Sequence, residues 1–187
     1  MKMQDEQKYR NDLLSQIKNA YGKVVYSYTT HWKQQNIYVN RLKKLKITEI
    51  VLSSISTTGL VSFLISNQWW IALIGTIFSA ISLALTLYTK DKRYEEAIAS
   101  HRVSADDLWL LREKYISLMT DFEAIETSEI VKRRDELEKC SSRIYKVAMP
   151  TTPKAYAEAQ KALKDEEEQF FSESELDLML PPHLRNS

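Results

Sequence analysis

The sequence predicts an all-α membrane protein, in which a hairpin of two transmembrane helices is flanked by helices that form a cytoplasmic bundle. The first observation is a stretch without any charged residue from 50 to 89, in a chain of which 27% of the residues are charged. The second is the scarcity of helix breakers, with three Gly and four Pro among 187 residues. The third is a repeat of apolar residues at steps of three and four on both flanks, which indicates amphipathic helices.

The charge-free stretch divides into two apolar runs, about 48–66 and 69–88, within a hairpin region 47–89. About twenty helical residues at a rise of 1.5 Å cover the roughly 30 Å hydrocarbon core of a bilayer. The alternative is a buried hairpin in a soluble helical protein, which needs partner surface on all sides of both helices. The polar flanks do not supply that surface, so we interpret the runs as membrane helices in contact with the lipid bilayer.

The ends of the two runs carry the residues expected at a membrane interface. Trp69, Trp70 and Tyr88 are amphipathic aromatic residues at the predicted headgroup level. Lys and Arg are frequent just before the first run and just after the second, whereas the turn at 66–68 has none. The positive-inside rule therefore predicts that both termini are cytoplasmic. The first 40 residues contain no apolar signal-peptide core, so the first membrane helix is expected to serve as its own insertion signal.

The flanks are expected to form the bundle. Region 1–46 is predicted as one amphipathic helix, and region 90–164 as a long helix with a break near 126–128, where Ser128 is the expected cap, followed by a short helix after Pro153. Region 165–187 is predicted as an acidic tail. The apolar seam of the long helix should pack against the N-terminal helix, a second subunit or both; it includes Ile98, Leu108, Leu111, Tyr115, Leu118 and Phe122.

Hydroxyl and small side chains form a row on each membrane helix. The candidate pore-lining or helix-packing residues are Ser54, Thr58, Ser62 and Ser66 on the first helix and Gly75, Ser79, Ser82 and Thr86 on the second. Small residues let membrane helices approach closely, and Ser and Thr can form hydrogen bonds between helices or back to their own helix. Two interpretations stay open: the two small faces pack against each other, or one packs and the other lines an aqueous path in an oligomer. We expect Glu49 to lie at the headgroup boundary and to reach the interface or pair with Lys46.

No constellation of catalytic, cofactor-binding or metal-binding residues is present in the sequence. His31, His101 and His183 are far apart and lack ligand spacing, and no phosphate-binding loop or hydrolase motif occurs. A single cysteine, Cys140, excludes an intrachain disulfide. The net charge of +1 gives no case for nucleic-acid binding. We therefore expect a protein that is not an enzyme and that binds neither nucleic acid, metal nor cofactor.

Three segments carry a resemblance to a known family: LWLLREKY at 108–115, TTPKAY at 151–156 and LPPHLR at 180–185. Together with the hairpin before them, they resemble SLATT-domain proteins over nearly the whole chain. The resemblance implies a bacterial two-transmembrane effector of the inner membrane, associated with nucleotide-second-messenger antiphage systems and other conflict systems. It further implies membrane pores that kill or arrest the cell, a separately encoded nucleotide-signal synthase or sensor as trigger, and no defined catalytic residues.

Two functions from different classes follow. In the first, the chain forms a homo-oligomer and opens a path along a hydroxyl row. In the second, it is a non-conducting, membrane-tethered helical scaffold or adaptor that recruits a signalling partner. A mere anchor does not need a row of hydroxyls, which favours the first.

Overall fold

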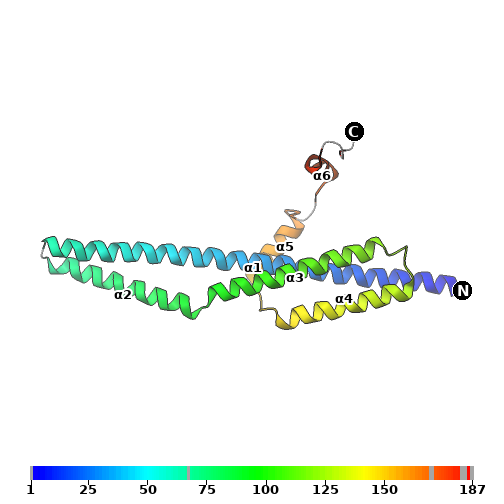
Figure 1. The fold of residues 1–187 in the computed structure, drawn as a ribbon, viewed down its shortest axis with the longest axis horizontal. Helices are drawn as coiled ribbons and strands as arrows, with labels where there is room; N and C mark the ends of the chain where they lie inside the picture. The colour runs from blue at the N-terminus through cyan, green and yellow to red at the C-terminus, as the bar shows by residue number, and fades with distance from the viewer. Residues whose placement is uncertain (1, 67, 169–170, 182–184, 186–187) are drawn as a thin grey trace.

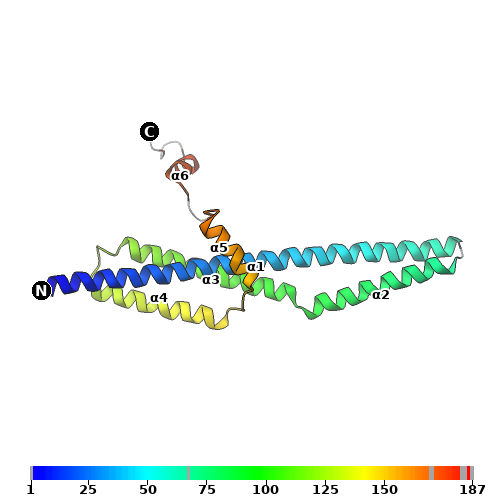
Figure 2. The same cartoon turned by 180° about the vertical axis from the view of Figure 1, so that it is seen from behind.

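The computed structural model describes residues 2–66, 68–168, 171–181 and 185, and all its regular elements in these ranges are helices. In chain order they are α1 (Lys2–Ser66), α2 (Trp69–Asp91), α3 (Tyr94–Thr120), α4 (Thr127–Val147), α5 (Pro153–Lys164) and α6 (Glu173–Met179). The all-α prediction is therefore confirmed. Figures 1 and 2 show an elongated molecule, with a two-helix hairpin at one end and a helical bundle at the other.

Helix α1 runs through both parts of the molecule without a break. It has 65 residues, so at a rise of 1.5 Å per residue it is roughly 100 Å long. The β-branched pair Thr29–Thr30 is accommodated in the helix because each hydroxyl donates to a carbonyl one turn earlier, on Val25 and Tyr26. The predicted boundary between 46 and 47 thus lies inside a continuous helix, which joins the bundle directly to the hairpin.

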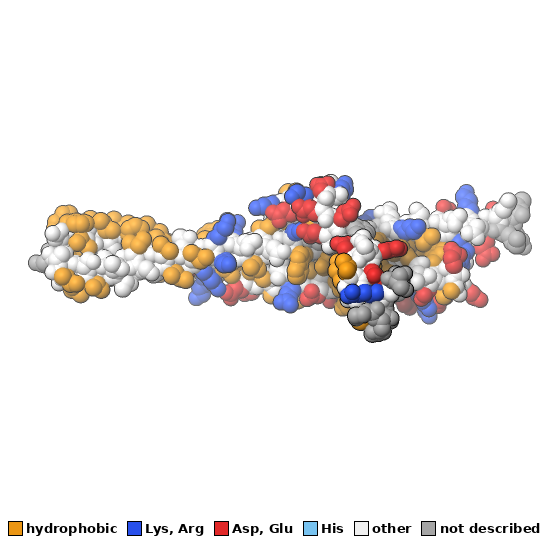
Figure 3. Space-filling model, turned by 90° about the horizontal axis from the view of Figure 1, so that it is seen from above, with side chains coloured by type: hydrophobic (Ala, Val, Ile, Leu, Met, Phe, Trp, Pro, Cys, Tyr) orange, Lys and Arg blue, Asp and Glu red, His pale blue; other side chains and the backbone are white. Residues whose placement is uncertain are grey.

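The hairpin consists of the second half of α1 and of α2. Both helices are long and apolar enough to cross a membrane, and only 6% and 11% of their most apolar windows are buried within the chain. Figure 3 shows hydrophobic side chains over this end of the molecule, while acidic and basic side chains cover the bundle. A soluble core hairpin would be mostly buried, so the exposure contradicts that alternative.

The bundle packs α3, α4 and α5 against the first half of α1. Its apolar core includes Leu13, Ile17 and Val24 from α1, together with Ile130 and Leu137 from α4. The α3 seam faces this core: Leu108, Leu111, Tyr115 and Leu118 are buried, as is Phe122 just after the helix, and Ile98 is half-buried. The seam therefore packs within one chain, against α1 and α4; packing against the N-terminal helix was one of the three arrangements expected from the sequence.

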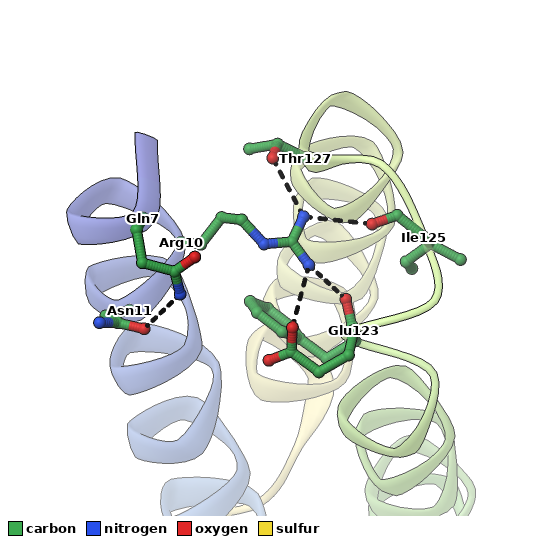
Figure 4. Close-up of polar contacts among 7 residues, drawn as sticks. Gln7, Arg10, Asn11, Glu123, Ile125 and Thr127 are labelled. Atoms are coloured by element: carbon green, nitrogen blue, oxygen red, sulfur yellow. Dashed lines mark hydrogen bonds and ion pairs between the residues drawn. The ribbon is translucent and has the colours of Figure 1, made fainter. Parts of the chain in front are cut away.

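The break between α3 and α4 lies where the sequence placed it, with a different cap. Helix α4 begins at Thr127, after Glu126, so Ser128 is a helical residue and not the cap. Arg10 of α1 holds this turn: its guanidinium donates to the carbonyls of Phe122 (2.7 Å) and Ile125 (3.2 Å) and to the Thr127 hydroxyl (3.1 Å) (Figure 4). A carboxylate, that of Glu123, lies 3.7 Å from the same guanidinium. The arginine thereby supplies donors to two part-buried carbonyls of the turn between α3 and α4.

Helix α5 lies across α1 and leads to α6. It starts at Pro153 behind a Thr152 cap, and Gln34 of α1 accepts from both the Thr152 amide (2.8 Å) and its hydroxyl (2.7 Å). The region predicted as an acidic tail contains α6, which has a capping box formed by Ser172 and Glu175. The remaining tail residues 169–170, 182–184 and 186–187, including His183, lie outside the described residues.

Candidate functional site

The inner face of the hairpin is a close contact between small residues of α1 and α2. A Cβ placed on Gly59 would lie 3.3 Å from the Gly75 Cα, and a Cβ on Gly75 would lie 3.2 Å from the Ser56 carbonyl oxygen. The Ser56 hydroxyl donates to the Gly75 carbonyl at 2.9 Å, and the hydroxyls of Ser53 and Ser82 are 3.0 Å apart. The backbones can approach this closely because neither glycine carries a side chain.

The α1 row predicted from the sequence lies on a different face. Ser54, Thr58 and Ser66 are exposed, and their hydroxyls donate to carbonyls four residues earlier at 2.8–2.9 Å. Ser62 is half-buried. The structure therefore separates two polar surfaces on α1. The residues that contact α2 are Ser53, Ser56 and Gly59, which the sequence reasoning did not select, and the outward hydroxyl row is Ser54, Thr58 and Ser66.

The α2 row is divided in the same way. Gly75 and Ser82 are buried against α1, whereas Ser79 and Thr86 are exposed. Thr86 lies at the membrane boundary, where its hydroxyl contacts the Glu49 carboxylate and also bonds the Ser82 carbonyl. The packing residues of this row, Gly75 and Ser82, could have been predicted from the glycine, since a glycine within an apolar helix indicates a close approach of a second helix.

Glu49 begins a hollow on the outward face of α1. The hollow has a volume of about 590 Å³, and its lining is Glu49, Ile50, Ser53, Ser54, Thr57 and Thr58. The expected partner of Glu49 was Lys46, but Lys46 pairs with Glu95 of α3 at 2.8 Å. Glu49 is instead held by Thr86, because α2 brings that hydroxyl beside it. The outward face is thus both polar and concave next to the membrane boundary.

The predicted interface aromatics lie at the two ends of α2. Trp69 and Trp70 start the helix at the hairpin turn, and their side chains are exposed, as is that of Tyr88. Tyr88 lies near the other end, where the Lys92 ammonium is 5.6 Å from its ring centroid. The α2–α3 turn that follows contains Arg93, whose φ of 48° gives the chain a left-handed residue where the membrane helix ends.

A buried histidine pair joins α1 to α3 where the bundle approaches the hairpin. His31 and His101 are 5% and 1% exposed, and their Nδ1 atoms are 2.9 Å apart. One imidazole must donate and the other accept, so the neutral pair contains two different tautomers. Burial and the neighbouring His101 lower the pKa of His31 to about 4, and burial also lowers the pKa of His101. The two histidines are 70 positions apart, and nothing in the sequence identifies His31 as the partner of His101.

The described residues contain no group of three His, Cys, Asp or Glu side chains that could hold a metal ion. Cys140 is a free thiol on α4, half-buried beside α3. The described residues thus offer a close helix contact in the hairpin, an outward polar face on α1 and a charged bundle.

Comparison with protein families matches residues 13–175 to the SMODS and SLOG-associating 2TM effector domain family 4. The match covers most of the chain, so the protein belongs to this SLATT family, and the expected resemblance is confirmed. Searches of curated proteins and of solved structures found no match. Family membership and the two apolar helices make the chain a membrane protein and an effector of the conflict-system type.

Proposed function

We propose that this two-transmembrane effector assembles into a homo-oligomer in the bacterial inner membrane and opens a water-filled path along the outward hydroxyl row. The observation that carries the proposal is the separation of the two polar faces of α1. The face with Ser56 and Gly59 is covered by α2, and Ser53 lies at its edge, bonded to Ser82 but exposed and lining the hollow. The outward row and its hollow are left for another copy or for water. A single hairpin encloses no path, so conduction requires assembly.

A non-conducting scaffold is the second candidate, and one observation favours it. The outward hydroxyls donate to carbonyls of their own helix, so lipid can surround them at little cost. In this case the hydroxyl row only contacts lipid and has no function of its own, and the bundle alone would recruit a partner.

Substitutions at Thr58 distinguish the two candidates. Thr58→Leu removes an exposed hydroxyl without touching α2, and Leu is favourable in a membrane helix, so insertion is retained. We expect this variant to insert and assemble but to lose dye release from liposomes and growth arrest in cells, whereas Thr58→Ser keeps both. Equal leakage by Thr58→Leu and the parent chain would refute a path along this row. If the parent chain never releases dye, even with its activating partner, conduction is refuted and the scaffold function remains.

The same proposal places both termini in the cytoplasm. Basic residues flank the outer ends of both membrane helices, and the ion pair of Lys46 with Glu95 brings the two flanks together on one side. In a Cys140→Ser chain, a cysteine at Gln68 should react with an impermeant maleimide on intact cells, and a cysteine at Glu158 of α5 should not. Labelling of the cysteine at Glu158 from outside the cell would contradict the cytoplasmic location of the C-terminal flank.

The trigger, under this proposal, is a separately encoded nucleotide-signal synthase or sensor that acts on the bundle. The chain itself catalyses no reaction and requires no cofactor. An oligomer that forms and leaks only when the partner is co-expressed is the expected result.

A further inference from the structure

A groove runs between α3 and α4 on the surface of the bundle. Two adjoining hollows of about 570 and 640 Å³ form it, and they share Lys114, Cys140 and Arg143. Its apolar lining comprises Leu110, Leu111, Leu118, Leu137, Ile144 and Val147. Leu110 and Val147 are 60% and 80% exposed, so part of this apolar surface is uncovered in the single chain.

The rim of the groove is basic. Five cationic residues line it against two acidic ones, Asp107 and Glu136; the cations are Lys114, Arg133, Lys139, Arg143 and Lys146. Only Arg133 has an ion-pair partner in the described part of the chain, Glu129 at 2.8 Å. The other four cations have none there. The groove therefore suits an occupant that is both acidic and apolar.

The C-terminal segment has that composition. From 165 to 181 the sequence contains seven acidic residues and no basic one. In α6, Leu176 and Met179 follow at a step of three, which places them on one face, and Leu180 follows just after the helix; none of the three is buried. Glu173 and Asp177 follow at a step of four on another face. This is the pattern of a short amphipathic helix that binds in a groove.

We propose that α6 of one copy docks in the α3/α4 groove of a second copy, with its apolar face on the groove floor and its carboxylates on the basic rim. The two surfaces match in charge and in apolar character. The docking goes beyond the proposed function: it requires that copies of the chain meet, but not that they conduct.

The position of the segment favours a neighbouring copy over its own groove. Glu168 is tied to α1 by an ion pair with Lys33 at 2.8 Å. From there to Glu173 the chain spans at most about 17 Å, from five steps of roughly 3.4 Å. Figure 1 shows α6 on one side of the bundle and α4 on the other, with α1 and α3 between them. A segment held there points away from its own groove and is available to another subunit.

The native thiol provides the test, because Cys140 lies in the groove and is the only cysteine. A tagged chain with Cys140 is co-expressed with an untagged Cys140→Ser chain that carries Met179→Cys. Membranes are oxidised with copper phenanthroline in air and run on a non-reducing gel. We expect a disulfide-linked heterodimer. Arg143→Glu in the tagged chain should lower its yield at least about fivefold, because an attraction becomes a repulsion. Glu173→Lys in the other chain should restore it.

Lys132→Glu is the matched control, because it makes the same charge change on α4 outside the groove lining. No heterodimer, or a heterodimer whose yield Arg143→Glu leaves unchanged, would overturn the proposal. An intrachain disulfide in a chain with both Cys140 and Met179→Cys, without the heterodimer, would show that the segment binds its own groove and would also overturn it. Dye release is measured separately, so a failed path and a failed docking give different results.

Discussion

The buried pair of His31 and His101 should make the bundle sensitive to mild acid. Burial and the facing imidazole hold the pKa of His31 at about 4, against 6.5 for the free side chain. The folded pKa is the lower one, so between these values the unfolded chain binds more protons. Stability is therefore complete above about pH 6.5 and is lost as the pH falls towards 4.

The magnitude follows from the two pKa values. Lowering the pH from 7.5 to 5 leaves His31 mostly neutral in the fold but protonated in the unfolded chain, which costs about 2 kcal/mol of stability. The pKa of His101 is lowered in the same direction, so its contribution has the same sign. For a chain of this length a loss of about 2 kcal/mol lowers Tm by roughly 4–8 °C. Thermal unfolding in detergent, followed by far-UV circular dichroism at pH 7.5, 6 and 5, measures it.

The matched variant is His31→Gln with His101→Gln, which removes both titrating groups from α1 and α3. Hydrogen bonds from Lys46 and Arg133 lower the pKa of Glu95 and Glu129 below the usual 4.5, so these carboxylates also lose stabilising contacts as the pH falls, but the double variant leaves their contribution unchanged. We expect the double variant to lose most of the decrease in Tm between pH 7.5 and 5. A parent chain whose Tm is the same at both values, or a double variant that keeps the whole decrease, would refute the reasoning.

Two further predictions concern the hairpin contact and the α3–α4 turn. Gly75→Leu places a side chain where a Cβ alone would lie 3.2 Å from a carbonyl oxygen, so disulfide crosslinks between cysteines introduced on α1 and α2 should disappear. The control is Gly22→Ala, whose Cβ meets nothing within 4 Å; it should raise the free energy of unfolding by about 0.5–1 kcal/mol. An intact hairpin in Gly75→Leu would contradict the close contact. Arg10→Met should cost about 2 kcal/mol, measured by urea unfolding, because it leaves the Phe122 and Ile125 carbonyls without donors; Lys8→Met, at an exposed position, should cost nothing measurable.

Much of the fold could be predicted because its signals are local. The absence of charge from 50 to 89 locates the hairpin, and the heptad-like spacing through Leu108 and Tyr115 identifies the face of α3 that is buried. The contacts that fix the bundle are not local. Arg10 reaches residues more than one hundred positions away, and His31 meets His101 across 70. An arginine or histidine inside a helical pattern carries no mark of its distant partner, so neither contact could be predicted.

The hydroxyl rows show where sequence periodicity stops being informative. In α1 the charge-free region offers Ser53, Ser54, Ser56, Thr57 and Thr58 almost consecutively, so hydroxyls point in nearly every direction and a step of four selects only one of several rows. Each hydroxyl can donate to its own helix, as Thr57 and Thr58 do, and its polarity then does not determine which way it faces. The glycines decide the register instead. Gly59 and Gly75 are the two positions in the hairpin without a side chain, and helices approach most closely where both lack one. Once these two are opposed, Ser56 must face α2 with Ser53 at the edge of the contact, and Ser54 and Thr58 are left on the outward face.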